Sequence, residues 1–324
     1  MSNTVVAVLR GGIGGEHEVS LSSGATVIQE LSKEQHDISV IDIFIDRSGT
    51  WYVRGVPKVP ERALVGVDVV WNALHGQYGE DGTVQRILDR IGVPYTGSTA
   101  YASALAMNKV LTKREVERLG IRTPRSTILS VTANLDSDVL NCFRSFPQPS
   151  VVKPLNSGSS VGVTIARSFN QLQDGVREVF QHASQVLVEE LIVGKEATCG
   201  VVDNFRNEVH YTLPPVEIIP PDASAFFDYD AKYSGLTSER CPGNFSSKET
   251  EDLKECARAA HHALGMRHYS RSDFIVSPRG IYFLEINSLP GTTGESLLPK
   301  SLQAVGVSMN EFVQHVLNLA RNRG

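Results

Sequence analysis

The chain has 324 residues, 41% of them hydrophobic, and this length and composition predict a folded protein of two to three domains. Its 31 Lys and Arg residues against 36 Asp and Glu residues give a formal net charge of −5, which offers no support for binding to nucleic acid or to a membrane surface. The apolar run 5–9 is too short for a signal peptide, no run is long enough to span a bilayer, and the four cysteines lack metal-ligand spacing. We therefore expect reduced thiols in a cytoplasmic protein.

The N-terminal part of the chain alternates between strand and helix patterns. A helix that ends near Leu31, with Ser20 or Ser22 as its N-cap, follows the first strand, and a single helix is predicted from Ser103 to Leu119, where Gly120 would end it. The βαβ rhythm predicts a parallel sheet covered by helices. The further segments are strands at 5–9, 38–45 and 67–74, a helix at 83–91, and a domain boundary at 94–98.

The remainder of the chain is also mixed α/β. Its predicted strands are 150–153, 162–166, 186–189, 196–203, 208–213 and 216–219, and its predicted helices are 170–181, 248–264 and 308–320.

A hairpin near the C-terminus carries the strongest local signal. Residues 284–291 predict a strand that ends in a Pro-Gly turn, so Glu285 and Asn287 share one face. A second strand begins at residue 271, and if the hairpin turns about Arg279, Asp273 lies opposite Glu285. Two carboxylates and an amide are hard oxygen ligands that suit Mg²⁺. The alternative is that these residues are solvated side chains on an exposed strand.

Two loops follow strands of the predicted parallel sheet, at the edge where such sheets bind ligands. The first, 11–15, is rich in glycine and is followed directly by Glu16, whose charge suits an ammonium group better than a phosphate. The alternative is a surface Glu near a helix start. The second loop, 74–82, contains His75, which is either a positioned polar contact or a structural histidine with satisfied hydrogen bonds.

Two further segments carry candidate nucleotide chemistry. Residues 153–163 predict a strand, a Gly-Ser loop and a strand, in which free N–H groups and Lys153 would contact a phosphate. The alternative is an ordinary Gly-Ser hairpin. Residues 220–245 form a long irregular segment with aromatic residues and Lys232, which is typical of a lid that closes over a nucleotide. The alternative is a surface Ω-loop.

Eight short segments occur in the order found in a known family, and they cover nearly the whole chain. They resemble the D-alanine–D-alanine ligases, a family of the ATP-grasp superfamily. The segments are Gly11-Gly12 with Glu16 to Ser20, Ala73 to Gly76 with Gly79 to Gly82, Pro94 to Ser98, Ala106 to Lys109, Val152 to Pro154 with Gly158 to Gly162, Tyr229 to Tyr233, Arg271 to Asp273, and Leu284 to Asn287 with Pro290-Gly291 and Ser296-Leu297.

The resemblance implies an α/β protein with a three-domain ATP-grasp fold and an N-terminal parallel-sheet domain. The expected domains are a substrate-binding domain at 1–98, a central ATP-grasp subdomain at 99–188, and a C-terminal subdomain at 189–324 with the lid at 220–245 and the metal site. The implied activity joins two D-alanines through a D-alanyl phosphate, releases ADP and phosphate, and serves peptidoglycan precursor synthesis. A homodimer is also implied.

The resemblance assigns roles to individual residues. Glu16 would hold the ammonium group of the first D-alanine, with Ser159 and Tyr233 beside it. Arg271 and the backbone N–H of Gly291 would stabilise the oxyanion. The remaining assignments are His75 for substrate binding; Ser296 and Leu297 for the carboxylate of the second D-alanine; Lys109, Lys153 and Lys232 for ATP phosphates; Glu189, Glu190, Leu191 and Ile192 for adenine; Glu196 for ribose; and Asp273, Glu285 and Asn287 for two Mg²⁺ (or Mn²⁺) ions.

Two alternatives remain open at this point. A sister ligase would join D-alanine to D-lactate or D-serine, but Tyr233 favours the dipeptide-forming type. A non-catalytic nucleotide-binding homologue would be expected to lack one of the residues that carry the chemistry. All four of those residues are present: Lys153, Arg271, Asp273 and Glu285.

Overall fold

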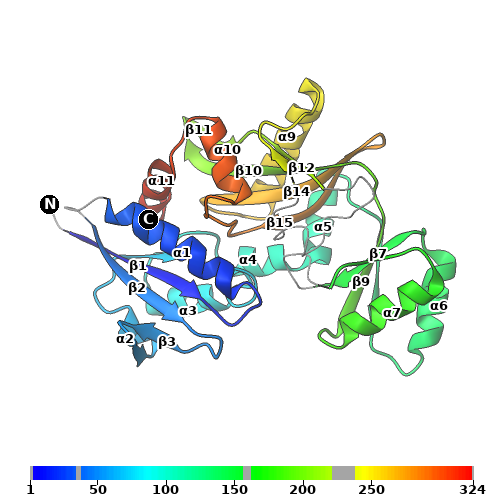
Figure 1. Ribbon diagram of the computed structural model, residues 1–324, viewed down its shortest axis with the longest axis horizontal. Helices are drawn as coiled ribbons and strands as arrows, with labels where there is room; N and C mark the ends of the chain where they lie inside the picture. The colour runs from blue at the N-terminus through cyan, green and yellow to red at the C-terminus, as the bar shows by residue number, and fades with distance from the viewer. Residues whose placement is uncertain (1–2, 34–37, 156–161, 221–237, 323–324) are drawn as a thin grey trace.

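The computed structural model describes residues 3–33, 38–155, 162–220 and 238–322, whose strands form three sheets (Figure 1). The first sheet has the order β4-β3-β2-β1-β5, and β1 is parallel to both β2 and β5. This confirms the predicted parallel sheet, to which an unpredicted antiparallel hairpin, β3–β4, is added. The strands are β1 (Thr4–Gly11), β2 (Ile38–Ile45), β3 (Trp51–Val53), β4 (Val56–Lys58) and β5 (Val69–Asn72).

Helices cover both faces of this first sheet, as a parallel sheet requires. Val6 and Val8 of β1 pack in one core cluster with residues of α1 and α11, whereas the alternate residues Ala7 and Leu9 pack with residues of α3. The four β1 side chains are completely buried. The helices are α1 (His17–Ser32), α2 (Pro60–Ala63), α3 (Thr83–Ile91) and α11 (Met309–Arg321).

The predicted serine caps of α1 are wrong. Glu16 occupies the N-cap position without a side-chain cap, and Ser20 and Ser22 lie within the helix. The Ser20 hydroxyl accepts from the Gly11 N–H at 2.9 Å and donates to the Ala73 carbonyl at 2.8 Å. Ser20 therefore joins α1 to the ends of β1 and β5, so its hydroxyl serves tertiary structure instead of a helix end.

The second sheet is wholly antiparallel, with the order β6-β9-β7-β8 and two helices packed against it. Three of its strands were predicted, whereas β6 and helix α6 were not. Figure 1 shows this sheet at the far right of the molecule, apart from the first sheet. Its elements are β6 (Ser126–Ser130), α6 (Leu135–Ser145), β7 (Ser150–Pro154), β8 (Thr164–Ala166), α7 (Phe169–Phe180) and β9 (Gln185–Glu190).

The third sheet lies between the other two in the view of Figure 1, and its order is β13-β12-β10-β14-β15, with β11 paired to β10. All of its strand pairs are antiparallel. The elements of this region are α4 (Ala100–Met107), α5 (Lys109–Glu117), β10 (Lys195–Phe205), β11 (Glu208–Thr212), β12 (Val216–Ile219), β13 (Ser238–Arg240), α9 (Ser247–Ala263), β14 (Tyr269–Ser277), β15 (Gly280–Asn287) and α10 (Leu297–Ala304).

The single helix predicted from Ser103 to Leu119 is wrong, because Asn108 divides it into α4 and α5. Asn108 has an extended backbone (φ −89°, ψ 98°), and its side chain accepts from the Leu111 N–H at 3.1 Å. Asparagine is a favoured N-cap, so this residue ends one helix and begins the next. The break places Lys109 at the first position of α5.

The domain limits predicted after residues 98 and 188 stay predictions. The three sheets draw their strands from residues 4–72, 126–190 and 195–287. Among the described helices, none is both long enough and apolar enough to cross a membrane.

Candidate active site

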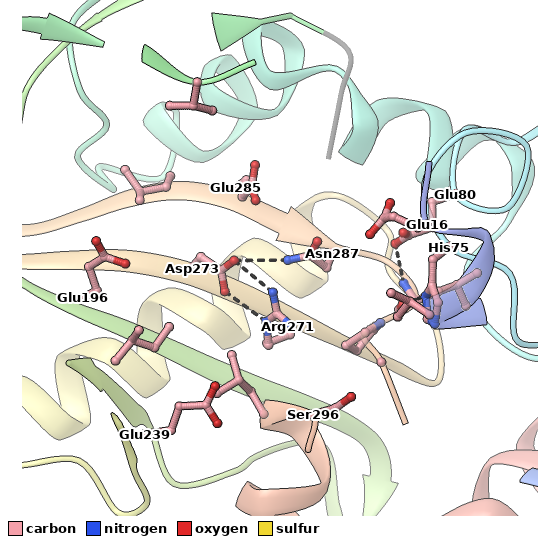
Figure 2. Close-up of a pocket in the computed structure, with 18 of the residues that line it drawn as sticks. Glu16, His75, Glu80, Glu196, Glu239, Arg271, Asp273, Glu285, Asn287 and Ser296 are labelled. Carbon is pink, nitrogen blue, oxygen red and sulfur yellow. Dashed lines mark hydrogen bonds and ion pairs between the residues drawn. The ribbon is translucent and has the colours of Figure 1, made fainter. Parts of the chain in front are cut away.

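A cavity of about 580 Å³ is lined by residues that come from all three sheets and their loops (Figure 2). It brings together most of the predicted site residues, although Ser159, Lys232 and Tyr233 lie outside the described part of the chain. Those that line it are Glu16, His75, Lys109, Lys153, Glu196, Arg271, Asp273, Glu285, Asn287, Gly291, Ser296 and Leu297. The predicted adenine segment, Glu189 to Ile192, is not among the described residues that line it.

The β14–β15 hairpin forms one wall of the cavity. Asp273 lies opposite Glu285, and Arg271 lies opposite Asn287, which confirms the register predicted from the sequence. A bulge follows Asp273. The side chains of Asp273 and Glu285 are only 16% and 21% exposed, so they are not solvated residues on an open strand face.

Asp273 is the centre of the polar network on this wall (Figure 2). Arg271 donates to both of its carboxylate oxygens at 3.0 Å, and Thr198 and Asn287 donate to it at 2.6 and 3.3 Å. Burial alone would lower the pKa of Arg271, but the carboxylates of Asp273 and Glu285 raise that pKa above its ordinary value. The guanidinium group is therefore held as a fixed cation at the cavity wall.

Lysine side chains approach the cavity from the central part of the chain. The Lys109 ammonium lies 3.1 Å from a Glu285 carboxylate oxygen. Lys153 lies 2.6 Å from one oxygen of Glu189, and the unpredicted Lys113 lies 2.6 Å from the other. The Glu189 carboxylate thus bridges the two lysine ammonium groups, one at each of its oxygens.

The Lys113–Glu189–Lys153 group is almost completely buried. The Glu189 side chain is 3% exposed, and those of Lys113 and Lys153 are 4% and 11% exposed. Burial alone would raise the pKa of Glu189, but the two lysines lower it overall, and burial lowers the pKa of Lys113 despite the attraction of Glu189. All three charges therefore depend on one another.

We expect Glu189→Gln to lower the free energy of unfolding by about 3–5 kcal/mol, because it leaves two buried ammonium groups without a counter-charge. Chemical denaturation would measure the change. The matched control is Glu190→Gln on the same strand, whose partner Arg279 lies 3.6 Å away and is 59% exposed. That variant should lose less than about 1 kcal/mol. Equal losses in the two variants would contradict the account.

Glu16 lies against the backbone of the second loop. A Cβ atom added to Gly76 would fall 2.2 Å from a Glu16 carboxylate oxygen, and Gly76 has a φ of +61°. Only glycine allows both this backbone conformation and this close approach. The two predicted loops therefore meet at one corner of the cavity, with the Glu16 carboxylate between them.

His75 has a protein partner at each ring nitrogen. Nδ1 lies 2.9 Å from the Leu289 carbonyl, which can only accept, so we infer that Nδ1 carries the proton and that Nε2 accepts from the Ser23 hydroxyl at 2.8 Å. Burial lowers the pKa of His75, which favours this neutral form. The structural reading of His75 thus has direct support, whereas its contact with a substrate stays a prediction.

Glu80 is a buried carboxyl group that was not among the predicted site residues. It accepts from the backbone N–H groups of Gly76 and Leu289 at 2.8 and 2.9 Å, and from the Ser288 hydroxyl at 3.3 Å. These bonds connect the second loop to the end of β15. Burial, followed by the nearby charge of Glu16, raises the pKa of Glu80 to about 7 despite these donors.

The raised pKa of Glu80 predicts a pH-dependent stability. Because the pKa rises from 4.5 in the unfolded chain to about 7 in the folded protein, the stabilising contribution is complete below 4.5 and is lost as the pH increases through 7. Raising the pH from about 5 to about 8 should therefore lower the free energy of unfolding by roughly 3 kcal/mol through this one group. Denaturation at several pH values should show that loss in the native protein and not in Glu80→Gln. If the free energy of unfolding depends on pH in the same way in both proteins, this prediction is wrong.

The predicted receptors for a carboxylate, Ser296 and Leu297, lie at the start of the unpredicted helix α10. Ser296 is the N-cap residue and Leu297 the first helical residue, and both line the cavity. The Ser296 hydroxyl is 2.8 Å from that of Thr293 and does not cap the helix. Backbone N–H groups at a helix start, together with the helix dipole, attract anions.

Three charged residues at or near the cavity were not predicted as site residues, and the sequence marks only some of them. Lys113 follows Lys109 by four positions and so lies on the same helical face. Glu80 belongs to a recognised motif, but its burial is a tertiary effect. Glu239 on β13 also lines the cavity and lies 2.6 Å from Lys300, and no local pattern marks it.

The three sheets, with lysines and carboxylates gathered in the cavity between them, define a protein of the ATP-grasp class. A model described as D-ala D-ala ligase N-terminus matches residues 5–61 and 57–98, and one described as D-ala D-ala ligase C-terminus matches residues 116–318. The chain therefore belongs to the D-alanine–D-alanine ligase family of enzymes.

Curated relatives and solved structures agree with this assignment. The D-alanine–D-alanine ligase of Halalkalibacterium halodurans is 37% identical over 97% of this chain and 98% of its own length. That of Syntrophobacter fumaroxidans is 38% identical over 97% of both chains. The VanG D-Ala:D-Ser ligase of Enterococcus faecalis superposes with a TM-score of 0.85 at 30% identity, covering 98% of this chain and 100% of that one. The D-alanine–D-alanine ligase of Bacillus anthracis superposes with a TM-score of 0.78 at 31% identity, covering 98% of this chain and 97% of that one.

Proposed function

We propose that the protein joins two D-alanine molecules through a D-alanyl phosphate, with release of ADP and phosphate, for peptidoglycan precursor synthesis. The observation that carries the proposal is the single cavity in which Glu16, Lys153, Arg271, Asp273 and Glu285 all meet. It combines a carboxylate for an ammonium group with cations for phosphates and with oxygen ligands for metal ions.

In the proposal, ATP occupies the side of the cavity between the second and third sheets. Lys109 and Lys153 contact its phosphates, Glu196 contacts the ribose, and residues 189–192 contact the adenine. Lys232 is proposed to reach the γ-phosphate, and it lies outside the described residues. Glu189 supports this arrangement indirectly, because its ion pair fixes the position of the Lys153 ammonium group.

The donor set of the β14–β15 hairpin fits Mg²⁺ or Mn²⁺. Asp273 and Glu285 supply carboxylate oxygens from paired positions on adjacent strands, and Asn287 supplies an amide oxygen from the same strand as Glu285. We propose that these three residues hold two such ions. When bound, the ions would neutralise negative charge on the phosphoryl group that is transferred.

The proposed amino-acid sites lie at the opposite side of the cavity. Glu16 holds the ammonium group of the first D-alanine, with Ser159 and Tyr233, both outside the described residues, beside it. Arg271 and the N–H of Gly291 donate to the oxyanion that forms at its carbonyl carbon. The start of α10, at Ser296 and Leu297, receives the carboxylate of the second D-alanine.

The proposed chemistry has two steps. A carboxylate oxygen of the first D-alanine attacks the γ-phosphorus of ATP, and ADP leaves with the electrons of the broken P–O bond. The amine of the second D-alanine, after losing a proton, then attacks the carbonyl carbon, and phosphate leaves with the former carboxylate oxygen. Exclusion of water protects the acyl phosphate between the steps.

A second candidate is the ligation of D-alanine to D-serine. It is favoured by the structural similarity to the VanG D-Ala:D-Ser ligase of Enterococcus faecalis. The two reactions differ only in the second substrate, so the described part of the cavity suits either.

Phosphate release, with products identified by mass, tests the proposal. The assay contains ATP, Mg²⁺ and D-alanine, alone or with D-serine or D-lactate. We expect phosphate and D-alanyl-D-alanine in equal amounts when D-alanine is the only amino acid. A mixed product in preference to the dipeptide would establish the second candidate, and ATP binding without phosphate release would contradict both. The predicted homodimer rests on the family resemblance and is tested by sedimentation velocity.

A further inference from the structure

A cluster of histidines surrounds Asp203 on the third sheet, outside the cavity described above. Asp203 of β10 lies opposite His210 of β11 in the antiparallel register, and His261 approaches the pair from α9. Antiparallel partners carry their side chains on the same face of the sheet. The two strands and the helix therefore bring one carboxylate and two imidazoles to one point.

The three side chains converge through specific atoms. The Oδ1 atom of Asp203 is 2.8 Å from Nδ1 of His210 and 2.9 Å from Nε2 of His261. One ligand atom from each residue lies within 4.8 Å of those of the other two. Four-coordinate zinc holds N and O ligands at about 2.0–2.1 Å, which places them about 3.3 Å apart. Small side-chain rotations would open the cluster to that spacing.

The outer contacts of the cluster fix the side chains in this orientation. The other ring nitrogen of His261, Nδ1, is 2.7 Å from the Ser270 hydroxyl, and the other ring nitrogen of His210 is 3.3 Å from Nδ1 of His262. The second oxygen of Asp203 accepts the His268 N–H at 2.6 Å. Metal-binding imidazoles usually have such a partner at the nitrogen that does not face the ion.

The three side chains of the cluster differ in exposure. His261 is completely buried, Asp203 is 13% exposed and His210 is 20% exposed. An ion could therefore enter on the side of His210 and keep a water molecule as its fourth ligand, while the inner ligands stay anchored in the core.

We propose that Asp203, His210 and His261 form a binding site for a divalent transition-metal ion of the Zn²⁺ class. Imidazole ligands suit such ions, whereas Mg²⁺ prefers oxygen ligands alone. The site is separate from the proposed Mg²⁺ site, because Asp203 lies five residues along β10 from Thr198, the partner of Asp273, which corresponds to about 17 Å. Its role would be structural, since the ion would join β10, β11 and α9. It does not depend on the proposed reaction.

Zn²⁺ titration in a large excess of Mg²⁺ tests this site, because Mg²⁺ occupies the oxygen ligands of the cavity. We expect one equivalent of Zn²⁺ to bind to the native protein and to raise its melting temperature. His210→Asn removes the most exposed ligand and should weaken Zn²⁺ binding by roughly 100-fold, since losing even an outer partner usually costs 10–100-fold. The matched control is His182→Asn, an exposed histidine that follows α7 and should leave binding unchanged.

Crystals of the unmodified protein soaked in Zn²⁺ provide a second readout that needs no variant. Anomalous scattering at the zinc edge should place an ion between the three side chains. The proposal is overturned if the native protein binds no Zn²⁺ in excess Mg²⁺, if His210→Asn binds Zn²⁺ as tightly as the native protein, or if the anomalous peak lies elsewhere. Each of those results would leave the cluster as a hydrogen-bonded junction of the sheet and α9.

Discussion

Replacing Glu285 with glutamine is expected to lower the rate of D-alanine ligation by about a thousandfold, or ~4 kcal/mol of activation free energy. The glutamine keeps the size of the side chain but removes the negative charge that faces Lys109 at 3.1 Å and that would bind the metal ions. Steady-state phosphate release at saturating ATP and Mg²⁺ would measure the effect.

The matched control for this variant is Glu295→Gln. Glu295 also lines the cavity, but its side chain is 97% exposed, so it should contribute little to activity. Turnover near the native level in Glu285→Gln, or an equal loss in both variants, would refute the metal assignment.

The second large effect is expected from Arg271→Lys, which should lower kcat by on the order of 10²–10³-fold. A lysine is a single point charge and cannot donate to both oxygens of Asp273 at once, as the guanidinium does at 3.0 Å, while also facing an oxyanion. Because Arg271 is proposed to act on the oxyanion, kcat should fall while the KM for ATP changes little.

Arg279→Lys is the matched control, because Arg279 lies at the turn of the same hairpin and is 59% exposed. It should retain native kinetics. A higher KM for ATP with unchanged kcat in Arg271→Lys would show that Arg271 serves nucleotide binding, and the oxyanion role would then be wrong.

The hairpin shows what the sequence could predict in this protein. Its turn was marked by Pro278 and Gly280, so counting residues outward from Arg279 predicted that Asp273 lies opposite Glu285. The structure confirms this opposition, and it also contains a bulge between Asp273 and Phe274 that was not predicted. The parallel core strands were predictable for a similar reason, because fully buried strands form continuous apolar runs. The roles of individual residues toward adenine and D-alanine came instead from the family resemblance.

Other elements were predicted wrongly or not at all, because the local sequence signal is compatible with more than one structure. Asn108 lies within a helical pattern, and only its extended backbone shows that it caps α5. Helix α10 carries Pro299 in its first turn, where proline is tolerated, yet proline in a sequence more often marks the end of a helix. The first turn of helix α6 contains Asp136, Ser137 and Asp138, polar residues that are typical of a loop.

The ionisable residues that were missed depend on contacts between distant parts of the chain. Glu80 accepts from Leu289, which is 209 residues away, and Lys113 pairs with Glu189, which is 76 residues away. A raised pKa or a buried ion pair arises from that packing and leaves no periodic pattern in the sequence.

Isotope transfer from D-alanine to phosphate tests the central claim most directly. D-Alanine labelled with heavy oxygen at both carboxylate positions is incubated with ATP, Mg²⁺ and the enzyme, and the released phosphate is weighed by mass spectrometry. We expect each phosphate to carry one heavy oxygen and to appear with one molecule of D-alanyl-D-alanine, because the attacking carboxylate oxygen leaves with the phosphate. Unlabelled phosphate would mean that water, and not D-alanine, receives the phosphoryl group, and would contradict ligation through a D-alanyl phosphate.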